Sequence, residues 1–298
     1  MNKFIFYFIS IVFLLSFILV ESANSPHPSH PSASPSDTPS VSPSPSPSKL
    51  NIRIRIYVTI RRDVRRCAWP QCGGYYLKKV NTDEPEMYVQ ELGGDDNGID
   101  LEKLDQYVLG GIMVQPQQNE NYPTFEVNDV ARALPLEGQS TNTMGADDGY
   151  YRMAMHGSNA IAYELNTNET YPVENVTEPY TPKFPVQKDW LDSRIMDNSI
   201  VAGTMISVTL RIKLVFIRPA HEMNYPCQEV NKYRCEIGYD DTYKRDHNRC
   251  LLNDGPCTKI GTCPHVSRRC PKGWKDVYWN AKPNACRKYV CDPAFLNQ

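Results

Sequence analysis

The sequence predicts an α+β fold that is predominantly β, with an antiparallel or mixed sheet, few short helices and a disulfide-rich C-terminal subdomain. Two long stretches of alternating apolar and polar residues, 51–62 and 206–218, are typical of half-buried strands. Eight of the ten cysteines fall within the last 72 residues, a density typical of small segments stapled by disulfides. We therefore expect a β-rich body with a cysteine-rich subdomain packed on it.

Composition and charge divide the chain into four segments. We predict a signal peptide over 1–22, a Pro/Ser-rich disordered linker over 23–48, the β-rich body over 49–226 and the cysteine-rich subdomain over 227–298. The last segment carries 13 Lys and Arg against 8 Asp and Glu, a net charge of +5. Residues 1–226 carry 19 against 26, a net charge of −7. A single domain containing both parts is favoured over two tethered domains.

The first residues resemble a secretory signal peptide. Lys3 precedes an unbroken apolar run from Phe4 to Val20, and small polar residues follow, so that cleavage after Ser22 or Ala23 is expected. The alternative is an uncleaved membrane anchor, because seventeen apolar residues approach the length that spans a bilayer. No second apolar run of that length occurs. We expect a secreted, extracellular protein with no membrane span after signal cleavage.

The segment from Ser25 to Ser48 is of low complexity and consists almost wholly of proline and serine. Proline fixes its own φ and lacks a backbone donor, so this segment is expected to be an extended, solvated spacer. Its hydroxyl groups are candidates for O-glycosylation.

The body is expected to contain several shorter strands between the two long ones. These lie at 74–80, 86–92, 111–115, 150–156 and 160–165. Three short helices are expected. The first runs over 101–109 after a cap at Asp100, the second from Asn128 or Asp129 to Leu134, and the third over 189–196.

Two N-glycosylation sequons begin at Asn168 and Asn175, in a polar, proline-containing stretch. A glycan on either asparagine would place this stretch at the surface of a secreted glycoprotein.

The cysteines are interpreted as disulfide-bonded, because an even number in an oxidising compartment indicates a disulfide framework. They are Cys67, Cys72, Cys227, Cys235, Cys250, Cys257, Cys263, Cys270, Cys286 and Cys291. The alternative is a zinc site formed by the two C-x₄-C pairs, Cys67 with Cys72 and Cys286 with Cys291, although zinc ligands usually occur in tighter pairs. Cys67 either closes on Cys72 or one of the two reaches the C-terminal cluster. The local bridge is favoured because it leaves both regions with even numbers.

Motifs that carry catalysis or bind cofactors are missing from the sequence. Residues 93–104 resemble a calcium loop, but Gly93 and Leu104 stand where its first and last acidic ligands belong. No nucleophile elbow, H-E-x-x-H motif, phosphate loop or dinucleotide fingerprint occurs. The sequence thus predicts no metal and no cofactor, identifies no catalytic residue and favours a protein that is not an enzyme.

Nucleic acid is excluded as a partner by the net charge of −2 and by the secretory signal. The basic C-terminal segment favours an anionic polysaccharide or another extracellular surface instead. Its first candidate residues are the pairs Arg268-Arg269 and Arg287-Lys288. Trp274, Tyr278 and Trp279 are candidates for stacking on sugar rings or, alternatively, for a small apolar core.

Several short motifs together resemble a known family. They include Cys-Gly-Gly-Tyr after a C-x₄ spacing (Cys67 to Tyr75) and the ending Cys-Asp-Pro-Ala-Phe (Cys291 to Phe295). The chain resembles secreted cysteine-containing domains of unknown function, found chiefly in bacterial extracellular proteins. Members also carry a cysteine pair between V-N and Y-V, where this chain has residues 82–87 without cysteine. The resemblance implies secretion and one continuous fold, and it lends no catalytic residue.

Three functions follow from these observations. The first is a secreted, non-catalytic, disulfide-stabilised protein that binds or structures an extracellular surface or matrix. The second is a secreted protease inhibitor that presents a rigid loop such as Leu251 to Pro256. The third is a hydrolase with a dispersed site near His156.

Overall fold

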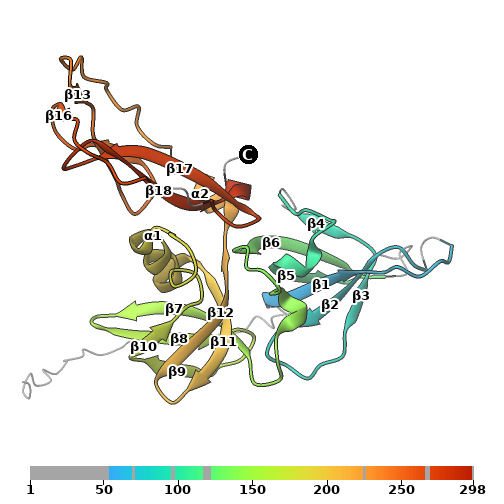
Figure 1. Ribbon diagram of the computed structural model, residues 1–298. Coiled ribbons are helices and arrows are strands. Elements are labelled where there is room, and N and C mark those ends of the chain that lie inside the picture. The colour runs from blue at the N-terminus through green and yellow to red at the C-terminus, as the bar shows by residue number, and fades with distance from the viewer. Residues whose placement is uncertain are drawn as a thin grey trace, which may run out of the picture. The chain divides into compact units, whose positions relative to one another are not determined.

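The computed structural model describes residues 54–68, 71–94, 98–116, 122–223, 226–265 and 269–296 (Figure 1). The predicted signal peptide and linker lie outside these residues. Residues 51–298 form one compact unit. The predicted fold class is confirmed, because the described residues are predominantly β with antiparallel sheets and few short helices.

Eighteen strands occur among the described residues. In the body these are β1 (Ile56–Arg62), β2 (Tyr75–Lys79), β3 (Met87–Val89), β4 (Leu92–Gly94), β5 (Tyr107–Val114), β6 (Thr124–Ala133), β7 (Gly149–His156), β8 (Asn159–Glu164), β9 (Thr170–Val173), β10 (Asn175–Thr177), β11 (Ile200–Ile206) and β12 (Thr209–Ile217). In the cysteine-rich region they are β13 (Tyr239–Asp240), β14 (Tyr243–Arg245), β15 (Leu251–Asn253), β16 (Thr258–Lys259), β17 (Trp274–Ala281) and β18 (Cys286–Pro293).

The described helices are short. They are η1 (Leu104–Gln106), η2 (Thr141–Thr143), α1 (Lys188–Ser193), the π-helical η3 (Arg194–Asn198), α2 (Pro219–Met223) and η4 (Ala294–Leu296). The helix expected over 189–196 thus corresponds to α1 and η3. The other two expected helices are wrong, since residues 107–114 belong to β5 and residues 124–133 to β6. The two longest alternating stretches form β1 and β12, which do not pair with each other.

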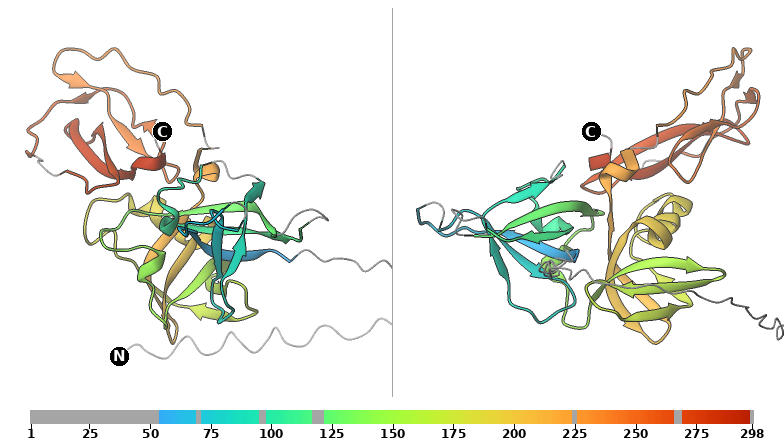
Figure 2. Two further views of the ribbon diagram at one scale, coloured as in Figure 1. Left: turned by 90° about the vertical axis from the view of Figure 1, so that its right-hand side faces the viewer. Right: turned by 180° about the vertical axis from the view of Figure 1, so that it is seen from behind.

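The body strands form one sheet in the order β3-β2-β1-β5-β6-β12-β11-β7-β8-β9. Neighbouring strands on this path are antiparallel. Two short strands pair in parallel, β4 with β6 and β10 with β12. Figure 2 shows the strands from β1 to β6 and those from β7 to β12 as two groups.

The two groups of strands have the same connectivity. In the first half of the sheet β1 pairs with β2 and β5, β2 with β3, and β6 with β5 and with the parallel β4. In the second half β7 pairs with β8 and β11, β8 with β9, and β12 with β11 and with the parallel β10. The antiparallel pair of β6 and β12 joins the halves at the centre. The body is therefore an internal repeat with approximate twofold symmetry.

Strand registers show which residues of the two halves are equivalent. Tyr57 opposes Gly110, where the register of β5 and β6 shifts between Gly110 and Gly111. Tyr150 opposes Ala202, where the register of β11 and β12 shifts between Ala202 and Gly203. The same irregularity at the same place makes Tyr57 equivalent to Tyr150. It is a β-bulge that a glycine permits in each half, because a Cβ on Gly111 or Gly203 would collide with a carbonyl oxygen of the neighbouring strand.

Two equivalent asparagines connect the halves. Asn81 follows β2, and its side-chain Nδ2 donates to the carbonyl oxygens of Tyr150 (2.7 Å) and Leu165 (3.0 Å). Asn166 follows β8, and its Nδ2 donates to the carbonyl oxygens of Tyr57 (2.7 Å) and Val80 (2.9 Å). Each Oδ1 accepts from a backbone amide, that of Tyr150 at 2.8 Å and that of Tyr57 at 2.7 Å. We call these contacts the asparagine bridges.

Apolar side chains fill each half and the space between them. One cluster belongs to the first half, with Phe125 and Leu77 among its fully buried members. A second joins residues of both halves, such as Val108 and Phe216. The largest lies in the second half and also includes Trp274 of the cysteine-rich region. Residues of the C-terminal region therefore share a core with residues of the body.

Candidate functional site

The cysteine-rich region is organised by two sets of interlocked disulfides. In each set the first cysteine pairs with the third and the second with the fourth. The pairs are Cys227–Cys250 with Cys235–Cys257, and Cys263–Cys286 with Cys270–Cys291. Cys67 pairs with Cys72, so all ten cysteines of the chain, which lie among the described residues, are bonded.

The disulfides account for the groupings that resemble metal sites. The four cysteines of the alternative zinc site are distributed over three different bridges. Two carboxylates do lie beside sulfur atoms, Asp241 with Cys235 and Cys257, and Asp276 with Cys270 and Cys291. Those sulfur atoms are bonded to each other, whereas metal binding by cysteine requires a thiolate.

The hairpin of β17 and β18 presents an aromatic and cationic face. Tyr278 opposes Tyr289 across the two strands, and their ring centroids are 5.9 Å apart. Arg287 lies two positions along on the same face because side chains alternate along a strand, and its Cζ lies 5.4 Å from the centroid of Tyr278. We call Tyr278, Arg287 and Tyr289 the tyrosine face. Tyr278 is 45% exposed and Arg287 is exposed.

Local electrostatics keep the Tyr278 hydroxyl protonated. Desolvation raises the pKa of Tyr278, and the negative charge of Asp276 raises it further. Asp276 also accepts a hydrogen bond from the backbone amide of Cys270 at 2.9 Å. The Tyr278 hydroxyl is neutral at ordinary pH, and the Asp276 carboxylate accepts a hydrogen bond from it.

The other aromatic candidates are structural. Trp279 is buried, with Arg245 and Lys288 within 6 Å of its ring centroid. Trp274 is buried in the core of the body, where its Nε1 donates to the carbonyl oxygen of Pro135 at 2.8 Å and its ring packs on Phe184. The sequence left two roles open for Trp274, Tyr278 and Trp279, stacking on sugar rings or forming a small apolar core. Of these three side chains, only Tyr278 is exposed.

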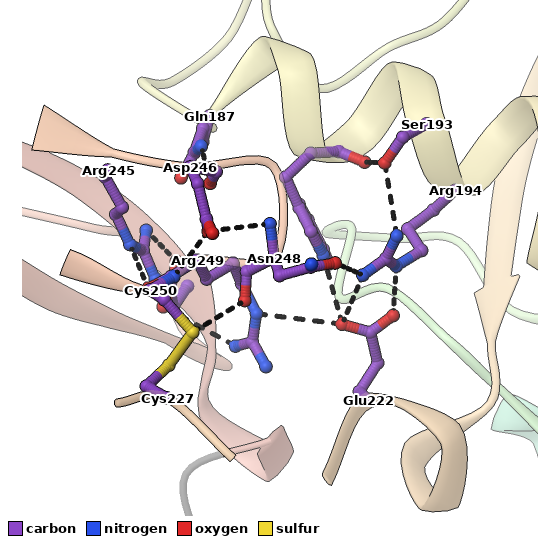
Figure 3. Close-up of polar contacts among 12 residues, drawn as sticks. Gln187, Ser193, Arg194, Glu222, Cys227, Arg245, Asp246, Asn248, Arg249 and Cys250 are labelled. Carbon is purple, nitrogen blue, oxygen red and sulfur yellow. Dashed lines mark hydrogen bonds and ion pairs between the residues drawn. A yellow bond between two sulfur atoms is a disulfide. The ribbon is translucent and has the colours of Figure 1, made fainter. Parts of the chain in front are cut away.

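A buried network of charges holds the cysteine-rich region on the body (Figure 3). Glu222 of α2 pairs with Arg194 of η3 and lies 3.7 Å from Arg249. Asp292 of β18 pairs with Arg245 of β14 and lies 3.5 Å from Arg249. All five side chains are at most 11% exposed. Three arginines and two carboxylates thus form one chain of contacts between the body and the cysteine-rich region, which we call the buried ion network.

The loop between β14 and β15 is fixed beside this network. Asp246 accepts hydrogen bonds from the backbone amides of Asn248 (2.9 Å) and Cys250 (2.8 Å). Gln187, just before α1, donates to the Asp246 carbonyl oxygen, and Asn248 accepts from Arg194 at 3.2 Å. Figure 3 shows how the Cys227–Cys250 disulfide fastens the same loop. The body thereby sets the position of the region that carries the tyrosine face.

Arg249 lies at the centre of the network. Burial lowers the pKa of Arg249, and the positive charges of Arg245 and Arg194 lower it further. The negative charges of Asp292 and Glu222 raise it, but the resulting pKa is still lowered. Because buried charges must be paired, each carboxylate is a structural requirement rather than a free functional group.

His156 and the loop at 251–256 are not part of any assembled site. His156 ends β7 and is exposed, and no carboxylate or hydroxyl among the described residues hydrogen-bonds its ring. Leu251–Asn253 form β15, which pairs with β14, and the amide of Asp254 donates to the carbonyl oxygen of Thr242. Half of the loop expected to present a rigid segment, Leu251–Asn253, is therefore part of a hairpin, with Leu252 exposed.

Asp100, expected as a helix cap, holds a turn instead. Its carboxylate accepts from the Glu102 amide at 3.1 Å and pairs with Lys103 at 2.7 Å. These interactions, led by the hydrogen bond from Lys103, lower the pKa of Asp100. The carboxylate is therefore already occupied by protein groups. Both sequon asparagines are exposed, Asn168 in the turn after β8 and Asn175 in β10.

Comparison with known proteins finds two similarities, neither to a protein of known function. Residues 56–86, which contain β1, β2 and the Cys67–Cys72 bridge, match a domain of unknown function (DUF6748). An uncharacterized protein of Dictyostelium discoideum is 28% identical over 253 residues, covering 78% of this chain and 85% of the relative. No solved structure matches the chain. Among the described residues, no helix is long and apolar enough to cross a membrane.

Proposed function

We propose that this is a secreted, non-catalytic protein whose cysteine-rich region binds an extracellular polysaccharide or protein surface. The tyrosine face carries the proposal. It places an exposed tyrosine beside an exposed arginine on a hairpin that two disulfides and the buried ion network hold rigid. Tyrosine and arginine are the residues most often found at the energetic centres of interfaces.

The distribution of exposed apolar side chains also supports the cysteine-rich region as the binding surface. Among the described residues, six of the twelve large apolar side chains that are exposed lie after residue 227: Tyr233, Ile237, Tyr239, Leu252, Ile260 and Tyr278. This region has a net charge of +5, in contrast to the acidic remainder. Exposed apolar groups together with positive charge favour an acidic, partly apolar partner such as an anionic polysaccharide.

Secretion is supported by the disulfides, because five bridges are typical of proteins from an oxidising compartment. The predicted signal peptide and Pro/Ser-rich linker agree with this location. The linker would hold the folded unit away from the amino terminus, and glycans on Asn168 and Asn175 would lie in the body.

The proposal is tested by retention of the secreted protein on immobilised polysaccharides, one neutral, one carboxylated and one sulfated. We expect retention on at least one acidic polysaccharide. Tyr278→Ala and Arg287→Ala should each weaken it about tenfold, since a buried aromatic or charge-assisted contact contributes roughly 1 to 3 kcal/mol.

Tyr239→Ala is the matched control, because Tyr239 is 44% exposed in the same region and lies on β13 outside the tyrosine face. It should bind like the unchanged protein. Equal losses in Tyr239→Ala and Tyr278→Ala would contradict a specific face. Lack of retention on all three polysaccharides and on intact cell surfaces would reject the proposed function.

A further inference from the structure

A cleft lies in the body, and none of the residues of the tyrosine face line it. Its volume is about 510 Å³, within the range of small-molecule sites. The polar residues that line it are Arg55, Asn128, Asp129, Arg152, Asp197 and Arg218. Three arginines against two aspartates give this cleft a net charge of +1.

Asp129 of the cleft accepts hydrogen bonds from three neighbouring side chains. Asp129 accepts from Arg218 at 2.6 and 3.0 Å, from Arg152 at 3.3 Å and from the Tyr57 hydroxyl at 3.3 Å. Burial lowers the pKa of Arg218, but its hydrogen bonds and charge interaction with Asp129 outweigh this effect, and the resulting pKa is raised. The Asp129–Arg218 pair therefore forms a fixed, charged wall of the cleft.

The other two arginines have unused donors. Arg152 binds Asp129 and the Tyr57 hydroxyl through Nη2 alone, its Nε is buried without a partner, and its side chain is 38% exposed. Arg55 is exposed, and it contacts no polar group among the described residues. A guanidinium has five N–H donors, so both side chains can still bind an acceptor that enters the cleft.

The second half of the sheet shows that the fold does not require these arginines. By strand register, Arg55 is equivalent to Asp148 and Arg152 to Thr59. Asp148 pairs with Lys213 at 2.7 Å and accepts from Thr204 at 2.7 Å. Lys213 is itself equivalent to Asn128. The second half thus has an ion pair, Asp148 with Lys213, at the positions where the first half has Arg55 and Asn128. Asn128 is uncharged and does not neutralise Arg55.

We propose that this cleft binds an oxyanion through Arg55 and Arg152, namely the carboxylate or sulfate group of an acidic saccharide. Arginine suits this role because its planar donors match the geometry of carboxylate and sulfate oxygens. The choice of a saccharide rests on the proposed function, whereas the choice of an oxyanion rests on the cleft alone.

The test follows the side-chain Nε–H resonance of Arg152 by NMR in the full secreted chain. Sodium sulfate, galacturonate and neutral galactose are titrated separately. We expect saturable shifts with sulfate or galacturonate and none with galactose. Binding of galacturonate without sulfate would identify a carboxylate site, and the reverse a sulfate site.

Arg55→Ala should weaken this binding about tenfold, the effect expected for losing a charge-assisted contact. Arg62→Ala is the matched control, because Arg62 is an exposed arginine at the end of β1, the strand that begins just after Arg55, and it does not line the cleft. Retained affinity in Arg55→Ala, or no saturable shift with either anion, would overturn the proposal. Normal sulfate binding without retention on any of the polysaccharides or on intact cell surfaces would preserve the cleft and reject the surface-binding function.

Discussion

At the scale of single residues, the asparagine bridges show how polar side chains can close a sheet. Asn81 and Asn166 adopt positive φ values of 56° and 64°, a conformation that asparagine tolerates better than most residues. Each amide satisfies three backbone groups of the other half of the sheet. These groups belong to strand ends, and the carbonyl oxygens of Tyr57 and Tyr150 accept in addition from the backbone amides of Val80 (3.1 Å) and Leu165 (2.9 Å).

We therefore expect Asn81→Ala to destabilise the protein by about 2 to 4 kcal/mol, because it removes the side-chain partners of the part-buried Tyr150 amide and Leu165 carbonyl oxygen and one of the two donors to the Tyr150 carbonyl oxygen. The free energy of unfolding from urea titration measures this loss. Asn142→Ala is the control, since Asn142 is exposed in η2 and should change stability by less than about 0.5 kcal/mol. Equal stability of the two variants would show that the bridges contribute little.

At the scale of elements, the strands with clear alternation were predictable, whereas β6, β11, the strands of the cysteine-rich region and two of the helices were not. Alternation identified 51–62 and 206–218 because buried and less buried residues alternate along part of each strand, as they do from Thr209 to Leu214. Asp189 to Met196 has the apolar spacing of a short helix. Asn128 and Asp129 looked like a helix start because such residues cap helices. Here they lie where the bulge shifts the register of β6, and Asp129 pairs with Arg218, which follows β12 and is 89 residues away in the sequence. Local pattern contains no information about that partner.

The residue types of the candidate site were predictable from the sequence, but their exposure and contacts were not. Cysteine spacing and compartment predicted disulfides, and Tyr278 and Arg287 were both candidates. That Tyr278 is exposed while Trp274 enters the core of the body depends on contacts across more than a hundred residues. The arginines of the cleft are likewise far apart in sequence, and no motif marks them.

The buried ion network makes α2 a critical short element. Glu222→Ala should cost about 3 to 5 kcal/mol, because it leaves Arg194 and Arg249 buried without their shared carboxylate. Urea unfolding of the full chain measures the change. Glu229→Ala, which removes an exposed carboxylate nearby in the chain, should have little effect. A loss below about 1 kcal/mol for Glu222→Ala would indicate that the network does not anchor the cysteine-rich region.

At the scale of the whole molecule, the internal repeat is the main feature that sequence reasoning missed. The halves retain similar short segments, Val80-Asn81-Thr82-Asp83-Glu84 and Leu165-Asn166-Thr167-Asn168-Glu169. The remaining equivalent positions have diverged in charge and size, as the pair of Arg55 and Asp148 shows. Because strand register and the two bulges define the equivalence, it becomes visible only once the strands are paired.

The second copy of this segment, residues 165–169, contains Asn168 of the first sequon. A glycan on Asn168 would show that the protein passes through the secretory pathway. Asn168 and Thr170 are exposed after β8, and Asn175 and Thr177 are exposed in β10, so both acceptor sites are open to glycosylation. We expect the full chain, expressed in a eukaryotic secretory host, to reach the medium with glycans at both asparagines. Peptide-N-glycosidase treatment and intact-mass measurement should then reveal two N-glycans.

Asn168→Gln and Asn175→Gln should each remove one of these glycans. The equivalent position of the first half is Asp83, which cannot accept a glycan, so no N-glycan is expected there. Amino-terminal sequencing of the secreted protein locates signal cleavage in the same experiment, with Ala23 or Asn24 expected as the first residue. A secreted chain without N-glycans would show that the exposed sequons are not used. A chain retained in the membrane fraction would favour the uncleaved anchor and would confine any surface binding to the cell that makes the protein.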